Sequence, residues 1–294
     1  MIPAHILNLL QAAFPCQPIG DFAATRGGFS NLTAIVTIGA QRCVIKAAAT
    51  ALKRTDVRRE ATMLRLLQGS DLPIPRLLAL VEDDRWTIAV TRWVAGEHGL
   101  TVLERAPEQL ESLYRALGLL LAKVHRMPLA APALAPKLED RTRDALARLP
   151  ALELERDLSA ALLEGLEHPI WRAQPRALAH GDAGLHNLLW DGQITALLDW
   201  EWAGWGTPLL DLAWLYWTIQ WRRLPPVLWH SFLAGYGAGP ALAKGAAPDE
   251  LYALALGQIA SILARAQGQP AGWEEWQRRL GWTMGMAFPG LGGG

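Results

Sequence analysis

Polar side chains gather in two short stretches of an otherwise apolar region. The first stretch contains His180, Asp182 and Asn187, and the second contains Asp199 and Glu201. Leucines neighbour both stretches, so we expect these polar groups at the edge of a hydrophobic core. A charge held there needs a partner, because leaving it buried and unpaired is strongly destabilising. A bound cation would be such a partner.

A carboxylate, an amide and a second carboxylate, in this order along the chain, suit the transfer of a phosphate group. Asp182 would orient an attacking hydroxyl and accept its proton. Asn187 and Asp199 would offer oxygen ligands to Mg²⁺, which holds the phosphates of a nucleotide. A hairpin predicted over 187–198 could bring these two ligands together. Because an Asp and an Asn five positions apart are common by chance, the rest of the chain must decide what the pair does.

A lysine and a glutamate in the N-terminal third complete the set. Lys46 ends the apolar run 42–46, which predicts a buried strand where an unpaired lysine would be out of place. Glu60 lies on a predicted helix over 55–68. A strand lysine paired with a helix glutamate positions the α- and β-phosphates in kinase-type folds. Each residue alone could be an ordinary surface charge, but the order of all five residues indicates a phosphotransfer site.

Two regions of different character must position these residues. The first is rich in β-structure, with strands predicted over 33–38, 42–47, 77–81 and 86–93 around the one helix. The second is helical, with helices predicted over 107–127, 141–165, 208–221, 226–236 and 248–267. We therefore predict an α+β fold, in which residues 1–94 form a nucleotide-binding N-lobe. Residues 95–294 would form a helical C-lobe with the catalytic hairpin and the acceptor site.

Composition excludes several classes of protein. The chain has 294 residues, 51% of them hydrophobic, and 28 basic residues balance 28 acidic ones, which argues against a nucleic-acid partner. Cys16 and Cys43 are too few for a disulfide framework, which favours a cytoplasmic setting. The N-terminal segment predicts a short amphipathic helix, and no segment predicts a membrane span. We expect a monomer or a homodimer.

The chain resembles the aminoglycoside phosphotransferase and choline kinase group, the small-molecule relatives of protein kinases. Two segments carry the most specific match, His180-Gly-Asp-Ala-Gly-Leu-His-Asn187 and Leu198-Asp-Trp-Glu-Trp-Ala-Gly204. Further matching segments are Gly27-Gly-Phe-Ser-Asn31, Cys43-Val-Ile-Lys46, Leu72-Pro-Ile-Pro75 and Pro208-Leu-Leu-Asp-Leu-Ala213. The resemblance implies a two-lobed protein-kinase-like fold and transfer of the γ-phosphate of ATP to an alcohol group. Mg²⁺ would be the cofactor, and GTP is the alternative to ATP.

The resemblance also implies a role for each matching residue. Asp182 would be the catalytic base, and Asn187 and Asp199 would be the magnesium ligands. Lys46, held by Glu60, would position the triphosphate. The other implied contacts are Ser30 and Asn31 over the phosphates, Thr91 and Trp93 beside the adenine, and Asp211 as a structural aspartate that ties down the catalytic segment.

The acceptor is expected to be a small molecule, because the 12 positions between Asp199 and Asp211 leave no room for the long segment that docks a polypeptide. The Asp-Trp-Glu-Trp-Ala-Gly block resembles the choline and thiamine kinase branch, whose substrates are cations that aromatic faces attract. Glu201, Trp202 and Trp205 are therefore the candidate acceptor contacts. Trp214, Trp217 and Trp221 have the spacing of a helix face packed into a core.

Three alternatives stay open. An antibiotic phosphotransferase with an aminoglycoside acceptor would need several carboxylates, which Glu153, Glu155, Asp157, Glu164 and Glu167 could supply, although a solvated helix face explains them equally well. A metal-dependent hydrolase could bind zinc through His180, Asp182, His186 and Asp199, but it leaves Lys46 and Glu60 without a role. A catalytically inactive kinase-like binding module typically lacks the lysine, the base or a metal ligand, all of which this chain retains.

Overall fold

The computed structural model describes residues 3–24, 32–128, 135–173, 176–242, 245–267 and 269–292. The chain forms two compact units. Unit 1 comprises Met1–Thr101 and His186–Trp202, and unit 2 comprises Val102–Leu185 and Ala203–Gly294. Unit 1 therefore contains residues 95–101 and the segment 186–202 in addition to the range of the predicted N-lobe. No helix of the described residues has the length and apolar character that a membrane span requires.

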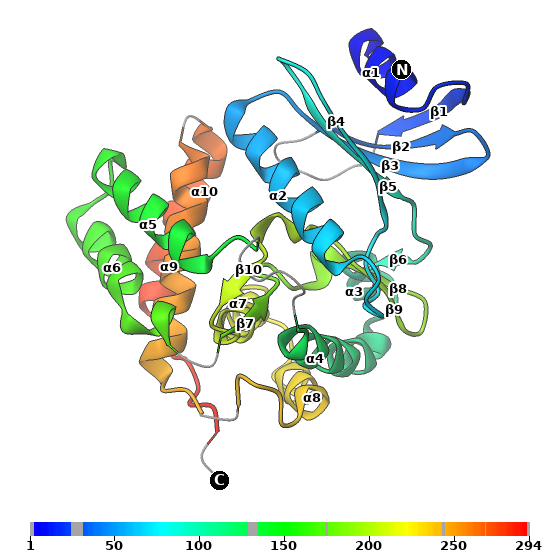
Figure 1. Ribbon diagram of the computed structural model, residues 1–294. Helices are drawn as coiled ribbons and strands as arrows, with labels where there is room; N and C mark the ends of the chain where they lie inside the picture. The colour runs from blue at the N-terminus through cyan, green and yellow to red at the C-terminus, as the bar shows by residue number, and fades with distance from the viewer. Residues whose placement is uncertain are drawn as a thin grey trace. The chain divides into compact units, whose positions relative to one another are not determined.

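Unit 1 is built on an antiparallel sheet with the strand order β1-β2-β3-β5-β4 (Figure 1). Its strands are β1 (Ile19–Ala24), β2 (Leu32–Ile38), β3 (Gln41–Ala48), β4 (Leu77–Glu82) and β5 (Thr87–Arg92). Successive side chains of a strand point to opposite faces. Cys43 and Ile45 join the hydrophobic core that includes Ile6 of α1 (Ala4–Ala13). Lys46 lies on the opposite face, where α2 (Ala51–Leu67) packs.

A second sheet of unit 1 carries the predicted hairpin. It consists of β6 (Glu97–His98), β8 (Leu188–Trp190) and β9 (Ile194–Leu197), in the order β6-β8-β9. The turn between β8 and β9 contains Gly192, whose φ of 92° favours glycine. The short helices η5 (Leu185–Asn187) and η6 (Trp200–Trp202) flank the hairpin. The hairpin predicted over 187–198 is thus confirmed.

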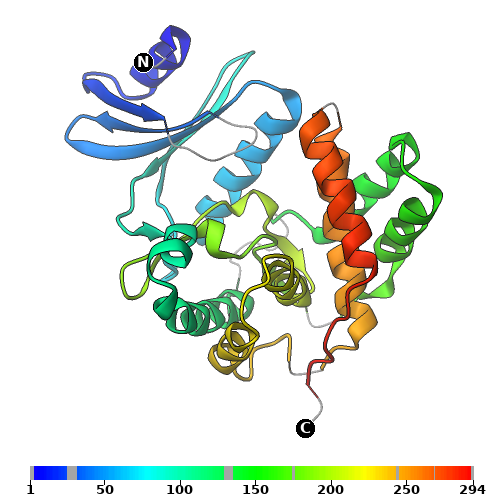
Figure 2. The ribbon, with the colours of Figure 1, turned by 180° about the vertical axis from the view of Figure 1, so that it is seen from behind.

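Unit 2 is mainly helical and is organised around α9 (Pro248–Ala266). Its other long helices are α4 (Leu110–Arg126), α5 (Leu138–Arg148), α6 (Arg156–Glu167), α7 (Leu209–Trp221), α8 (Val227–Tyr236) and α10 (Pro270–Met284). Shorter elements are η1 (Pro107–Gln109), η3 (Leu149–Ala151), η4 (Pro169–Arg172), β7 (Ala177–Ala179) and β10 (Gly204–Gly206), and α3 (Gly99–Arg105) begins in unit 1 and ends in unit 2. The helices α5, α6, α7 and α10 all contact α9, and Figure 2 shows α10 alongside it.

Two helical features differ from the sequence prediction. The predicted helix over 141–165 is two helices, α5 and α6, because Pro150 interrupts the helical hydrogen bonding between them. The structure also contains α10, which the sequence analysis did not predict. Pro270 at its first position and the helical spacing of Trp273, Trp276 and Leu280 were the available signals.

The helices α4 and α8 pack closely at two glycines. A Cβ atom on Gly235 would overlap the backbone carbonyl of Arg115, and one on Gly118 would overlap that of Phe232. In both cases the obstacle is helix backbone, which cannot move aside as a flexible side chain can. The absence of a side chain at these positions therefore sets the distance between the two helices.

A Gly235→Ala variant is expected to be destabilised by about 1–3 kcal/mol, because the added methyl group forces α4 and α8 apart. The matched control is Gly281→Ala in α10, where a Cβ would meet no atom within 4 Å. That control should gain roughly 0.5–1 kcal/mol, since alanine is the better helix former. Thermal unfolding followed by circular dichroism separates the two, and equal midpoints for Gly235→Ala and the unmodified chain would contradict the prediction.

Candidate active site

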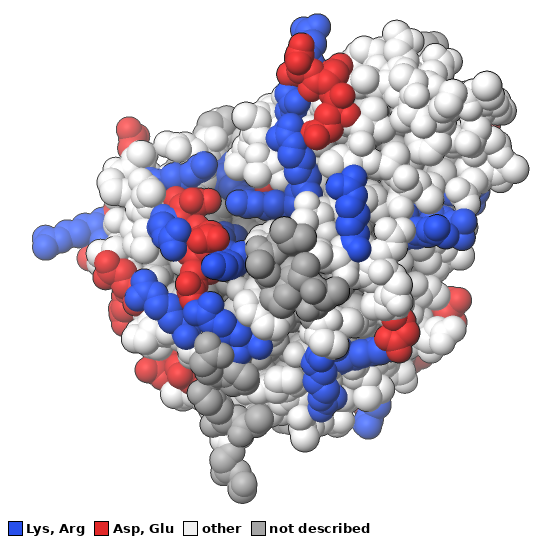
Figure 3. All heavy atoms as spheres, in the orientation of Figure 1, with Lys and Arg blue, Asp and Glu red and all other residues white. Residues whose placement is uncertain are grey.

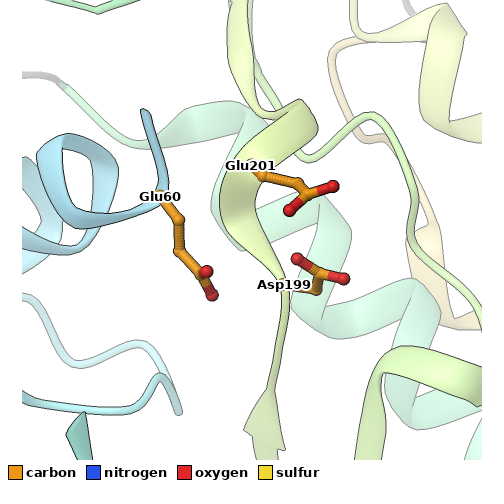
Figure 4. A group of neighbouring side chains, drawn as sticks. All are labelled: Glu60, Asp199 and Glu201. Atoms are coloured by element: carbon orange, nitrogen blue, oxygen red, sulfur yellow. The ribbon is translucent and has the colours of Figure 1, made fainter. Parts of the chain in front are cut away.

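Unit 1 brings together four of the charged residues that the sequence analysis singled out. Lys46 Nζ lies 3.0 Å from Glu60 Oε2, 2.7 Å from Asp199 Oδ1 and 2.7 Å from Glu201 Oε2. We call Lys46, Glu60, Asp199 and Glu201 the lysine–carboxylate cluster. Lys46 comes from β3, Glu60 from α2, and the other two from the segment at η6, against which α2 packs. Figure 4 shows the three carboxylates.

The hairpin and one strained residue place the carboxylates of the second stretch. The backbone N–H of Leu198 donates to the carbonyl oxygen of Asn187 at 2.8 Å. Asn187 and Asp199 are therefore at the same end of the hairpin, as the sequence predicted. Asp199 has a φ of 62°, a left-handed conformation that aspartate tolerates better than most residues. This turn directs the chain from β9 into η6, where Glu201 follows.

Burial and the charges of the cluster both shift the pKa values of Lys46 and Glu60. Burial alone would lower the pKa of Lys46, but the carboxylates of Asp199, Glu60 and Glu201 outweigh it and raise that pKa well above its usual value. Burial and the negative charges of Asp199 and Glu201 raise the pKa of Glu60 to about 7, although Lys46 opposes them. The cluster therefore has an excess of negative charge, which a proton on Glu60 compensates in part at neutral pH.

The cluster also fits a divalent cation. One oxygen from each of Glu60, Asp199 and Glu201 lies within 4.8 Å of the others. Carboxylate oxygens are the ligands that Mg²⁺ prefers. An excess of negative charge in a mostly buried position is the electrostatic condition for binding a metal ion. The residues present thus suit magnesium, and the buried Asn187 lies at the start of the hairpin that Asp199 follows.

In unit 2, side chains of two helices hold the backbone of the segment that contains the predicted base. The carboxylate of Asp211 on α7 accepts hydrogen bonds from the backbone N–H groups of His180, at 2.8 Å, and Gly181, at 2.6 Å. The amide of Gln258 on α9 donates to the carbonyl oxygen of Gly181 at 2.8 Å. The backbone N–H and the carbonyl oxygen of Gly181, the residue before Asp182, are therefore both hydrogen-bonded. The backbone N–H of Asp182 in turn donates to Nδ1 of His180 at 3.2 Å, so that His180 is a hydrogen-bonded turn residue.

Asp211 is itself part of a buried hydrogen-bond network. Nε2 of His125 lies 2.9 Å from Asp211 Oδ2, and Nδ1 of His125 lies 2.7 Å from the hydroxyl of Tyr236. That hydroxyl accepts from the backbone N–H of Ala241, which leaves its proton for Nδ1 of His125. Because an ionised carboxylate can only accept, we assign a His125 proton to Nε2, where it is donated to Asp211. Burial would raise the pKa of Asp211, but its hydrogen bonds with His125 and the backbone of His180 outweigh burial and lower it.

An Asp211→Asn variant is expected to be less stable at pH 7 and to lose less stability on acidification. The pKa of Asp211 is lower in the folded chain than the value of about 3.9 in the unfolded chain. Its carboxylate therefore stabilises the fold above that value, and the contribution disappears as the pH falls through the folded pKa. Urea unfolding at pH 7, 5 and 3 measures the difference. A variant that loses stability in parallel with the unmodified chain would contradict the prediction.

The remaining predicted site residues are placed as follows. Ser30 and Asn31 lie outside the described residues. Thr91 is on β5, and Trp93 follows it, with its backbone N–H donating to Arg42 and its ring 4.1 Å from the Arg42 guanidinium. Trp202, in unit 1, and Trp205, in β10 of unit 2, are both half-buried. The roles predicted for all of these residues stay predictions.

The tryptophans of α7 pack against one another. The rings of Trp214 and Trp217 stack at 4.6 Å, and those of Trp217 and Trp221 stack at 5.7 Å. Trp276 of α10 stacks on Trp214 at 6.2 Å. The core-packing interpretation is confirmed for Trp214 and Trp217, which are buried. Trp221 is half-buried, and besides Trp217 the guanidinium groups of Arg278 and Arg279 lie over its ring, at 4.7 and 5.0 Å.

Two residues that hold the segment, His125 and Gln258, were not predicted from the sequence. Both lie on the buried face of their helix, four positions after Leu121 and Leu254 respectively, and a buried polar group without a partner is destabilising. A polar residue in an apolar stripe was the available signal. On the surface, Figure 3 shows basic and acidic side chains interspersed on one face, as a net charge of zero allows.

Comparison with known proteins identifies the family. The model of a family described as "Phosphotransferase enzyme family" matches residues 21–254, which is most of the chain. None of the curated protein sequences gives a significant match. The solved structures include a thermostable mutant of aminoglycoside phosphotransferase APH(4)-Ia in a ternary complex with ADP and hygromycin B. It has a TM-score of 0.69 and 18% identity, over 94% of this chain and 96% of that chain.

Two further solved structures are similar over almost the whole chain. An aminoglycoside-3'-phosphotransferase of type VIII has a TM-score of 0.69 and 22% identity, over 88% of this chain and 100% of that chain. Macrolide 2'-phosphotransferase MphH from Brachybacterium faecium has a TM-score of 0.64 and 21% identity, over 93% and 97%. These similarities confirm the predicted kinase-like α+β fold, with an antiparallel sheet in one unit and a helical second unit. By the extent of the family match, this chain belongs to the phosphotransferase enzyme family.

Proposed function

We propose that this phosphotransferase moves the γ-phosphate of a magnesium-bound nucleotide, ATP in preference to GTP, onto a hydroxyl group of a small organic molecule. The lysine–carboxylate cluster is the observation that supports the proposal most directly. A hydrolase with zinc on His180, Asp182, His186 and Asp199 would give Lys46 no function, whereas a phosphotransferase uses a lysine and carboxylates together. The similar APH(4)-Ia structures with ADP and AMP-PNP support an adenine nucleotide.

Within this proposal, each residue of the cluster has a distinct task. Lys46, oriented by Glu60, binds the α- and β-phosphates. Asp199 and Asn187 hold Mg²⁺, which supplies charge neutralisation at the phosphates when it is bound. Glu201 was expected to contact the acceptor, but its position 2.7 Å from Lys46 favours the nucleotide and metal side instead. Lys46 contacts Asp199 and Glu201 directly, so the lysine for the phosphates and the carboxylates that would hold the metal belong to one site.

Asp182 acts on the acceptor. Its carboxylate orients the hydroxyl group and accepts the hydroxyl proton while the new oxygen–phosphorus bond forms. The bond between the γ-phosphorus and the bridging oxygen breaks, and the nucleoside diphosphate leaves. Asp211 and Gln258 keep the backbone before Asp182 in place, so that the base is held before the acceptor binds.

For the acceptor, we propose an amine-bearing alcohol, with antibiotics ahead of choline-like compounds. The similar structures are named for aminoglycosides, for a macrolide and for gentamicin. The acidic residues that could contact an aminoglycoside, 153, 155, 157, 164 and 167, are all exposed, which is typical of a solvated helix face. The alternative of a choline- or thiamine-like acceptor is supported by the sequence block 199–204. Its candidate aromatic contacts are Trp202 and Trp205.

A nucleotide-consumption screen tests the function. Purified protein with Mg²⁺ and either ATP or GTP would be offered aminoglycosides, macrolides, choline, ethanolamine, thiamine and sugars, and products would be identified by mass. We expect magnesium-dependent consumption and one phosphorylated acceptor class. Thermal stabilisation by Mg-ATP without any product would instead indicate an inactive binding module. Stoichiometric zinc after purification, with no effect of nucleotide, would overturn the proposal in favour of a hydrolase.

A further inference from the structure

The indole of Trp214 contacts the carboxylate of the proposed base. Trp214 lies on α7, and its Nε1 is 2.8 Å from Oδ1 of Asp182. Its side chain is only 3% exposed. An indole nitrogen can only donate a hydrogen bond, so Asp182 accepts this one. The contact joins a buried donor to an acceptor that the proposed reaction requires to be ionised.

We propose that Trp214 is a positioning residue that sets the rotation of the Asp182 carboxylate toward the acceptor hydroxyl. This inference rests on the proposed function, in which Asp182 is the base. During transfer, the hydroxyl proton passes to Asp182, the acceptor oxygen bonds to the γ-phosphorus, and the nucleoside diphosphate leaves with the electrons of the broken bond. Trp214 exchanges no proton. It acts only by holding the carboxylate that does.

The backbone contacts cannot perform this task by themselves. Asp211 and Gln258 fix the main chain at His180 and Gly181, and therefore determine where Asp182 begins. The last torsion of an aspartate side chain is broad and roughly two-fold, so a fixed backbone does not by itself set the angle of the carboxylate plane. A hydrogen bond to one named oxygen restricts that angle. Trp214 supplies such a bond.

The indole is itself held rigidly. Trp214 stacks on Trp217 with an interplanar angle of 2°, and on Trp276 with an angle of 18°. Trp217 is anchored in turn, because its Nε1 donates to Thr283 Oγ1 of α10 at 2.8 Å. Rotation of the Trp214 ring would break the stacking on both neighbours. The donor therefore faces Asp182 before any substrate arrives, which is the arrangement that makes a polar contact effective in catalysis.

The chain contains a matched control for the test. Trp171, in η4 of the same unit, is 4% exposed and donates one hydrogen bond of the same length, 2.8 Å, but to the carbonyl oxygen of Gly165 and not to Asp182. Trp214→Phe and Trp171→Phe both replace a buried indole by a phenyl ring and remove one N–H donor. The two variants should therefore lose similar thermal stability.

Turnover of Mg-ATP separates the two variants, measured with the acceptor that gives product in the screen, or with water where none does. Trp214→Phe is expected to lower kcat by about 10- to 100-fold while KM for Mg-ATP changes little, as for an interaction that acts on the chemical step. Trp171→Phe should keep kcat within about twofold. Equal loss of kcat in both variants, or none in Trp214→Phe, would overturn the inference.

Two further measurements keep the inference testable. The first applies if the Trp214→Phe protein does not fold, and the second separates a wrong role of Trp214 from a wrong assignment of the base. Benzothienylalanine at position 214 replaces only the indole N–H by sulfur, so it keeps the stacked shape, and it should reproduce the loss of kcat. Trp214→Phe combined with Asp182→Asn should lower the residual rate no further than Asp182→Asn does. If Asp182→Asn alone keeps full turnover, the proposed base is wrong. If it removes turnover and the Trp214 variants do not, only the role of Trp214 is wrong.

Discussion

An Asp182→Asn variant is expected to lose phosphotransfer by a factor of about 10²–10⁴, the usual contribution of a general base. Asparagine has the same shape as aspartate and keeps an oxygen that can accept the hydrogen bond from Trp214. The fold and the nucleotide contacts of Lys46 should therefore survive. Steady-state kinetics should show a large fall in kcat with KM for Mg-ATP nearly unchanged, and thermal stabilisation by Mg-ATP should persist.

The control for this variant is Asp191→Asn. Asp191 is exposed in the turn between β8 and β9, so the same chemical change there alters the net charge of the protein equally without touching the proposed site. Its kcat should stay at the level of the unmodified chain. Retention of that level by Asp182→Asn would require another residue to be the base.

A Lys46→Met variant is expected to be strongly destabilised and nearly inactive. Removal of the lysine leaves the carboxylates of Glu60, Asp199 and Glu201 facing one another. Breaking a buried ion pair costs about 3–5 kcal/mol, and we expect about 3 kcal/mol because Asp199 is 35% exposed and partly solvated. Mg²⁺ should raise the thermal midpoint of this variant more than that of the unmodified chain, since the metal replaces the missing cation.

The destabilisation should depend on pH in a defined direction. Without Lys46, Glu60 holds its proton more tightly than it does in the unfolded chain, since its pKa is already raised to about 7 while the lysine is present. Stability is then lost as the pH rises through the folded pKa. The Lys46→Met variant should therefore have a lower free energy of unfolding at pH 8 than at pH 6. Arg58→Met, which breaks the surface pair of Arg58 and Glu82, should cost at most about 1 kcal/mol at either pH.

The sequence allowed prediction of the elements whose pattern is local. The strands β2 and β3, the hairpin of β8 and β9 and the helix α9 have the periodicity or turn residues that identify them. The charged pair of Lys46 and Glu60 was also accessible, because both residues stand in local contexts that make them unusual. These features depend on a few neighbouring residues, which a single sequence displays.

The rest depends on contacts between distant positions. Glu201 was predicted to face the acceptor, and only the packing of α2 against η6 shows that it lies on Lys46. Trp214 has the spacing of a core residue and is one, yet its indole nitrogen also contacts Asp182, which periodicity cannot show. Gln258 lies in an apolar helix, and its partner Gly181 is 77 positions away. Hydrogen bonds of this kind have no local signature.

The discontinuous make-up of unit 1 has a consequence for the order in which the molecule can assemble. Asp199 follows Lys46 by 153 positions, and the whole of residues 102–185 is synthesised between them. At a translation rate of about 5–20 residues per second, Lys46 waits roughly 8–30 s on the ribosome before Asp199 and Glu201 exist. Until then β6 also lacks its neighbour β8. The nascent N-terminal sheet can form early, but its charged face is completed only after most of the polypeptide has been made.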